Sequence, residues 1–145
     1  MTKTNKASGG FNPFAHNTAT ACDTGYEFEL LFPVSGDPTG AFITVVGKEG
    51  AAFQKFIRDR GNAKLREELA LQRRGKEVPA ITVEQIERDA IELLIACTVG
   101  WRGLVDENGE ELAFTHENAA KLYSMRDYRM QVDEAIGDLG NFMKA

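Results

Sequence analysis

The sequence contains little of what membrane segments and secretion signals are made from. No apolar run approaches the roughly 20 residues that a helix needs to cross a bilayer. The first ten residues, MTKTNKASGG, have no apolar stretch behind their lysines, and so do not predict a secretion signal. We therefore expect a soluble protein that stays inside the cell and makes no membrane contact.

The residues that most often carry chemistry are scarce as well. There are only two cysteines, Cys22 and Cys97, and only two histidines, His16 and His116. Zinc needs clustered Cys and His, which this sequence lacks, and neither histidine has a nucleophile and an orienting acid beside it in the sequence. We expect free thiols in a reducing compartment, and a non-enzymatic protein with no catalytic residue, no metal and no cofactor.

Charge is unevenly distributed along the chain. The formal net charge is −5, with 17 basic and 22 acidic residues. Residues 48–77 carry nine basic and five acidic side chains, a net of +4, whereas residues 78–145 carry six and thirteen, a net of −7. A protein that binds nucleic acid in bulk is usually basic throughout, so this balance disfavours that role. Opposite patches on one small protein favour protein partners or self-association.

Two parts can be distinguished along the 145 residues. Residues 1–25 are rich in Thr, Ser, Asn, Gly and Ala without periodicity, which predicts a disordered leader. Phe11 and Phe14 stand out within it, either as exposed aromatics on a flexible arm or as a short motif that docks on a partner. Residues 26–145 have the length and apolar content of one α+β domain.

The domain begins with the pattern of a β-hairpin. YEFELLF alternates apolar and acidic side chains, as in a half-buried strand. PVSGDPTG follows as a turn-rich connection, and AFITVVG is β-branched and aromatic like a second strand. Because a lone hairpin is marginally stable in water, we expect it to pack on helices or on another chain.

Helical spacing of apolar residues dominates the remaining sequence and predicts four to five helices. Residues 49–74 form an imperfect stripe that Gly61 and Asn62 divide or kink. Thr82 and Gln85 form a capping-box pattern that opens a second, more apolar helix ending near Cys97. Two more helices are expected to begin near residues 115 and 127.

The segment GWRGLVDENGEEL, residues 100–112, holds the only tryptophan and several acidic residues. Its acidic spacing suggests a calcium loop, but that loop requires glycine at its sixth position, and a glutamate stands there. We interpret Asn108-Gly109 as a tight turn in a small second hairpin near residues 104–114. The segment is then a structural corner, formed by Gly100, Trp101, Gly103, Asn108 and Gly109. We expect the Trp101 indole to fill the interior of this corner.

The order and wording of these elements resemble the tail assembly chaperone family of long-tailed phages. The resemblance covers residues 26–142: the hairpin, a charged helix, and then ELLIACTVGWRGLVDENGEELAFTHENAAKLY and QVDEAIGDLGNF. The pattern C-T-x-G-W-x-G, followed by a turn and a short polar-capped helix, contributes most to it. The leader lies outside the resemblance.

The resemblance implies a non-catalytic role in tail morphogenesis. Members of the family bind the tape measure protein and help to recruit tail tube subunits around it in the host cytoplasm. They are usually absent from the mature virion. Two alternatives stay open: a minor structural tail protein of the virion, or a small regulatory protein that binds nucleic acid.

A chaperone for a long helical partner needs apolar, adaptable surface. Met125, Met130, Phe142 and Met143, near the end of the chain, are candidates for that surface together with Phe11 and Phe14 of the leader. The alternative is that the four C-terminal residues belong to the core of the domain.

Overall fold

A three-stranded antiparallel sheet forms one layer of the molecule. The computed structural model describes residues 9–143 and has the strand order β1-β2-β3. The predicted hairpin is present, with β1 spanning Tyr26–Leu31 and β2 spanning Pro38–Val45. Tyr26 lies opposite Val45 and Phe28 opposite Ile43, and the register shifts between Glu29 and Leu31. The expected α+β class is confirmed.

The third strand, β3 over Thr98–Arg102, was not predicted. It pairs with β2, with Trp101 opposite Ile43 and Gly100 opposite Thr44. The expectation of a corner that begins at Gly100 is therefore wrong, because the chain stays extended through this residue. A five-residue strand gives too short a periodic signal to detect, and only its pairing with β2 makes it a strand.

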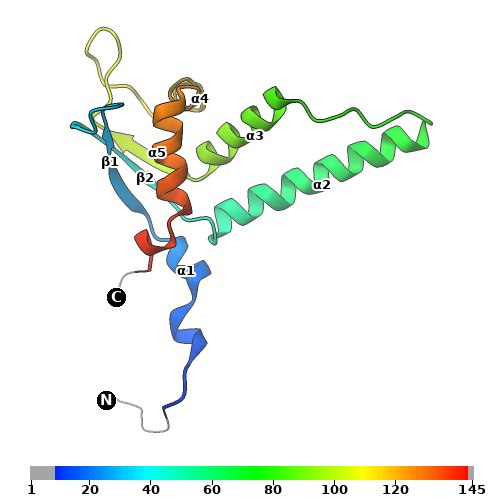
Figure 1. Ribbon diagram of the computed structural model, residues 1–145, viewed down its shortest axis with the longest axis horizontal. Helices are drawn as coiled ribbons and strands as arrows, with labels where there is room; N and C mark the ends of the chain where they lie inside the picture. The colour runs from blue at the N-terminus through cyan, green and yellow to red at the C-terminus, as the bar shows by residue number, and fades with distance from the viewer. Residues whose placement is uncertain (1–8, 144–145) are drawn as a thin grey trace.

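Within residues 9–143, five α-helices accompany the sheet (Figure 1). They are α1 (Thr18–Cys22), α2 (Ala51–Arg73), α3 (Val83–Ala96), α4 (His116–Tyr123) and α5 (Arg126–Gly137), with 3₁₀ turns at Pro13–His16 and Leu139–Asn141. The Thr82–Gln85 capping box opens α3, and α2 is continuous through Gly61 instead of divided. No helix within residues 9–143 combines the length and hydropathy of a membrane span.

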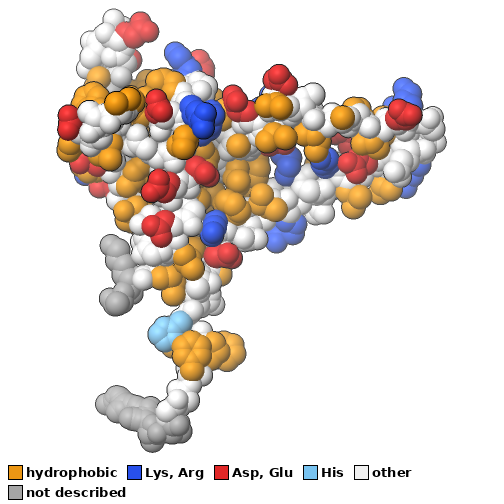
Figure 2. Space-filling model, in the orientation of Figure 1, with side chains coloured by type: hydrophobic (Ala, Val, Ile, Leu, Met, Phe, Trp, Pro, Cys, Tyr) orange, Lys and Arg blue, Asp and Glu red, His pale blue; other side chains and the backbone are white. Residues whose placement is uncertain are grey.

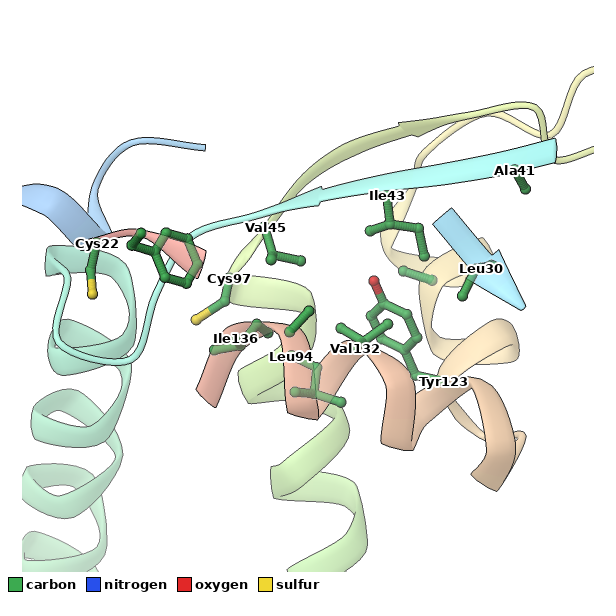
Figure 3. Close-up of a cluster of buried hydrophobic side chains, with 13 residues drawn as sticks. Cys22, Leu30, Ala41, Ile43, Val45, Leu94, Cys97, Tyr123, Val132 and Ile136 are labelled. Carbon is green, nitrogen blue, oxygen red and sulfur yellow. The ribbon is translucent and has the colours of Figure 1, made fainter. Parts of the chain in front are cut away.

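The core lies between one face of the sheet and the helices α3, α4 and α5 (Figure 3). Ile43 and Val45 of β2 point toward Leu94 of α3 and Val132 of α5. Tyr123 is fully buried, and its hydroxyl group is 2.7 Å from the Thr98 Oγ1, which itself donates to the Leu94 carbonyl. The sheet is thus closed on one side by the ends of α3 and by α4 and α5.

The predicted leader is partly ordered, so the predicted boundary at Tyr26 is wrong. Residues 13–22 form a 3₁₀ turn and α1, and Cys22 at the end of α1 is fully buried. The Gly47 amide donates to the Cys22 carbonyl over 2.8 Å, and a Cβ on Gly47 would lie 2.5 Å from the Cys22 sulfur. This close packing is a tertiary contact that leader composition does not reveal. Residues 1–8 lie outside the described residues.

The predicted second hairpin is reduced to one isolated bridge, between Val105 and Glu111. Its turn is present: the Asp106 amide donates to the Glu110 carbonyl over 2.8 Å, and Gly109 has φ +79°. Asn108 does not take a positive φ, because the turn is built on the Asp106 side chain instead. The Asp106 carboxylate accepts from the Asn108 and Glu110 amides over 2.8 and 3.0 Å.

Candidate functional site

The helix α2 is the longest helix in residues 9–143 and is accessible along its whole length. It has 23 residues and none of them is buried. It projects away from the sheet, and the chain returns along it through residues 74–82 into α3 (Figure 1). We call α2, this connection and α3 the helical arm. A helix in water without a packed face is marginally stable, so an arm of this kind is suited to contact a partner.

The base of the arm is fixed by the segment that precedes the sheet. The Asp23 carboxylate accepts from the Ala51 amide over 2.7 Å, which satisfies a free donor in the first turn of α2. The Gln54 side chain donates to the Lys48 carbonyl over 2.8 Å. Gly50 leaves the room for this contact, since a Cβ there would lie 2.7 Å from the Asp23 oxygen. The arm therefore leaves the body in a defined direction.

A groove of about 460 Å³ lies between α2 and the end of α3. Its lining is mostly apolar and consists of Ala52, Lys55, Phe56, Asp59, Arg60, Ala63 and Ala96. Hydrophobic side chains gather at this place in the space-filling view (Figure 2). A groove of this kind, with small side chains along a helix, can accept the apolar face of a second helix.

Charged pairs border the groove. Lys55 pairs with Asp59 one turn along α2, and this hydrogen bond holds the pKa of the Asp59 carboxyl below its usual value. Arg60 reaches Asp89 of α3 over 3.4 Å, and its guanidinium lies 5.1 Å from the centre of the Phe56 ring. These exposed pairs hold the charged side chains in place at the edge of the groove, but they contribute little to the free energy of unfolding.

More exposed apolar side chains lie at the far end of the arm. Val78 and Ile81 of the connection are exposed, and so are Val83 and Ile86 in the first half of α3. Ile86 begins the stripe that continues through Leu94 and Cys97 into the core, so only the second half of that stripe is covered. The periodicity of this helix predicts an apolar stripe, but it does not show where the element that covers the stripe stops.

The segment around Trp101 is structural in its contacts. The Trp101 indole donates from Nε1 to the Leu112 carbonyl over 2.8 Å, and its ring packs edge-on against Phe114 at 5.0 Å. Gly103 turns the chain with φ +83°, and a Cβ there would lie 2.5 Å from the Gly40 carbonyl oxygen. The indole thus fastens the loop 104–114 to the strand β3.

The residues expected to contact a partner do not form one surface. Phe11 and Phe14 are exposed, at 74% and 89%, and the Phe11 ring stacks on His16 with centroids 5.4 Å apart. Met125 and Met130 are also exposed, at the start of α5 and within it. They remain candidate contacts, but they lie on separate elements.

Two of the six expected contacts are placed differently. Phe142 is 7% exposed and packs edge-on against Tyr26, with ring centroids 5.9 Å apart, so the structure places it in the core. Met143 beside it is half-buried. The end of α5 folds back toward the first strand, and this contact removes Phe142 from the accessible surface.

Cysteine, histidine and acidic side chains are the remaining candidates for a metal or reactive site within residues 9–143. No group of three or more His, Cys, Asp or Glu side chains is placed there to hold a metal. Burial raises the pKa of the Cys97 thiol to about 11, so this thiol is protonated at neutral pH and is a poor nucleophile. His116 is paired with Glu92 of α3 on the surface.

The groove between α2 and α3 was not predicted from the amino-acid sequence. The signal available was the imperfect apolar stripe of residues 49–74, in which Ala52, Ala63 and Phe56 fall on one side of the helix. No family model matches the chain, and neither a curated protein nor a solved structure is significantly similar to it.

Proposed function

We propose that this chain is a tail assembly chaperone of a long-tailed phage. In this role it binds the tape measure protein in the host cytoplasm, helps to recruit tail tube subunits, and is absent from the mature virion. The sequence resemblance over residues 26–142 suggests the role, and the observation that carries it is the helical arm: α2 has no buried residue and borders an apolar groove.

The groove suits a long helical partner such as the tape measure protein. Its alanines let a second helix approach closely, and Phe56 supplies a large apolar contact. The rim pairs Lys55–Asp59 and Arg60–Asp89 offer both signs of charge, so an amphipathic helix finds partners for its flanking residues. The binding is non-catalytic.

Co-expression with the tape measure protein tests the proposal. The chain should keep the tape measure protein soluble and co-purify with it. Ala63→Glu places an unpaired charge in the groove and should weaken the complex about tenfold or more, or roughly 1.4 kcal/mol. Ala113→Glu is the matched control, because this exposed alanine lies outside the arm and should leave the complex intact.

The proposal fails if the tape measure protein is equally insoluble with and without this chain. Mass spectrometry of purified phage particles distinguishes an assembly chaperone from a structural protein of the virion. Stoichiometric copies of the chain in the particle would favour the minor structural tail protein.

One observation favours a second candidate, a small regulatory protein that binds nucleic acid. Several basic side chains of the arm form no ion pair among the described residues, namely Arg58, Lys64, Arg66, Arg73 and Arg74. A gel shift at about physiological salt, where non-specific phosphate contacts weaken, would reveal this activity. Loss of the shift with the same residues changed to glutamine would assign the binding to the helical arm.

A further inference from the structure

The face of α2 that points away from the groove has its own pattern. Between Gln54 and Gln72, at 3.6 residues per turn, eight residues fall within about 120° of the helix circumference. They are Gln54, Ile57, Arg58, Gly61, Leu65, Glu68, Leu69 and Gln72. The groove residues Ala52, Phe56 and Ala63 fall on the opposite side. We call these eight residues the ridge face.

The ridge face is apolar at its centre and uncovered. Ile57, Leu65 and Leu69 are 49%, 54% and 43% exposed. Together with Gly61 they occupy every fourth position, which forms one continuous ridge along a helix. Three large aliphatic side chains side by side in solvent are an unusual surface for a helix, and indicate that another element covers them.

The ridge face is complementary to itself. Consider two copies of α2 that lie antiparallel, with a two-fold axis at the level of residue 63. Each residue of one copy then lies level with the residue of the second copy that is equally far from position 63 on the other side. Ile57 then meets Leu69 of the second copy, and Gly61 meets Leu65. Arg58 meets Glu68, and Gln54 meets Gln72. Apolar residues therefore face apolar ones, amides face amides, and opposite charges face each other.

The charges on this face select the antiparallel arrangement. Arg58 and Glu68 have no ion pair anywhere in residues 9–143. Two parallel copies would place Arg58 beside Arg58 and Glu68 beside Glu68, which is repulsive. The antiparallel copies instead form the pair Arg58–Glu68 twice, once on each side of the axis.

Gly61 leaves the centre of the ridge face without a side chain. Glycine inside a helix costs about 1 kcal/mol relative to alanine, yet α2 runs through it without interruption. A Cβ on Gly61 would have no neighbour within 4 Å, so the space above it is open. That space accepts the Leu65 side chain of the second copy.

We propose that two copies of this chain associate through the ridge faces of α2, antiparallel about a two-fold axis. The occupant is a second copy because every side chain needed to complete the contact is on the same face of the same helix. The grooves lie on the far sides of the two helices and stay open in the dimer. The inference does not depend on the tail assembly role.

Charge reversal tests the pairing directly, with the molar mass of the full chain measured by light scattering or sedimentation. The native chain should be a dimer. Arg58→Glu and Glu68→Arg should each weaken the dimer roughly tenfold or more, because two attractive contacts become repulsive. An equimolar mixture of the two variants should form heterodimers, since both cross pairs are then attractive. Native mass spectrometry distinguishes the heterodimer by mass.

Two further variants separate this contact from loss of folding. Leu65→Glu changes an exposed side chain and should give a folded monomer with unchanged circular dichroism. Arg66→Glu is the matched control, because Arg66 lies outside the ridge face and its reversal should leave the dimer intact. A monomeric native chain at high concentration would overturn the proposal. A dimer that persists in both the Leu65→Glu and the Arg58→Glu variants would also overturn it. The same holds if the Arg58→Glu and Glu68→Arg variants do not associate when they are mixed.

Discussion

At the scale of single residues, the two glycines beside Trp101 have different roles. Gly103 adopts φ +83°, and its α-carbon lies so close to the neighbouring strand that a Cβ would be 2.5 Å from the Gly40 carbonyl oxygen. Gly100 is extended within β3, and a Cβ there would meet nothing within 4 Å. Of these two positions, only position 103 has a backbone conformation and a close contact that require glycine.

The two positions therefore form a matched pair of substitutions. Gly103→Ala should lower the free energy of unfolding by about 2–4 kcal/mol, from left-handed backbone strain and the clash with Gly40. Gly100→Ala should change it by less than about 0.5 kcal/mol. Urea denaturation followed by tryptophan fluorescence measures both values. Equal effects of the two substitutions would contradict this assignment.

A second residue-scale prediction concerns Cys97, which is fully buried and has a pKa raised from 9.0 to about 11 by burial. Below pH 9 the thiol is protonated in both folded and unfolded chains, so its contribution to stability is fully present. As pH rises from 9 toward 11 the unfolded chain ionises first, and stability is lost. The free energy of unfolding should fall by about 1 kcal/mol between pH 8 and 10 from this group.

Cys97→Ala provides the comparison for the pH profile. The variant is less stable at every pH because it loses buried volume, but its stability should fall less steeply between pH 8 and 10. Tyr123, whose pKa burial raises to about 12, contributes mainly above pH 10 in both proteins. Parallel profiles for the native chain and the variant would rule out the role of Cys97.

At the scale of elements, α2 depends on a residue outside itself. The helix has no side-chain cap of its own at Gly50, and Asp23 at the end of α1 supplies the acceptor for the Ala51 amide. A carboxylate beside a helix N-terminus is also favoured by the helix dipole. The ordering of residues 18–23 and the direction of the arm are therefore linked.

Asp23→Ala should lower stability by about 1 kcal/mol, the usual effect of losing an N-terminal cap. Amide hydrogen exchange should accelerate first in the opening turn of α2, while the sheet keeps its protection. Asp37→Ala, in the turn between β1 and β2, serves as the control and should leave exchange in α2 unchanged. Uniform acceleration over the whole chain would indicate a global effect instead of a local one.

At the scale of the whole molecule, the body and the arm differ in how much surface they bury. In the body, the sheet packs against α4, α5 and the C-terminal half of α3, where the arm joins the body, with at least thirteen buried hydrophobic residues. The arm buries none of the residues of α2. Local opening is cheapest where few apolar contacts are lost, so the free end of the arm should open most often.

Limited proteolysis should follow this difference. Among the sites in residues 9–143, trypsin should cut first after Arg73, Arg74 or Lys76, at the junction of α2 with its extended connection. Arg102 and Lys121 of the body should be cut much later. Peptide mass mapping over time identifies the order, and early cleavage at Arg102 or Lys121 would contradict it.

Elements whose signals lie in neighbouring residues could be predicted from the amino-acid sequence. The alternation of residues 26–32 and the β-branched run that follows predicted the hairpin, because side chains of a strand alternate between two faces. Thr82 and Gln85 predicted the start of α3, since a capping box needs only residues of one turn. Asn108 and Gly109 predicted a turn for the same reason, although the structure builds that turn on the Asp106 side chain.

Features that depend on contacts between distant residues could not be predicted in this way. The strand β3 exists because residues 98–102 find β2, some fifty residues earlier, and Cys22 is buried because Gly47 leaves it room. Phe142 was open to two interpretations, and its packing on Tyr26 placed it in the core. Burial and exposure depend on which elements meet, and the periodicity of one segment carries no information about its neighbour. For that reason the arm, its groove and its ridge face emerged only from the folded chain.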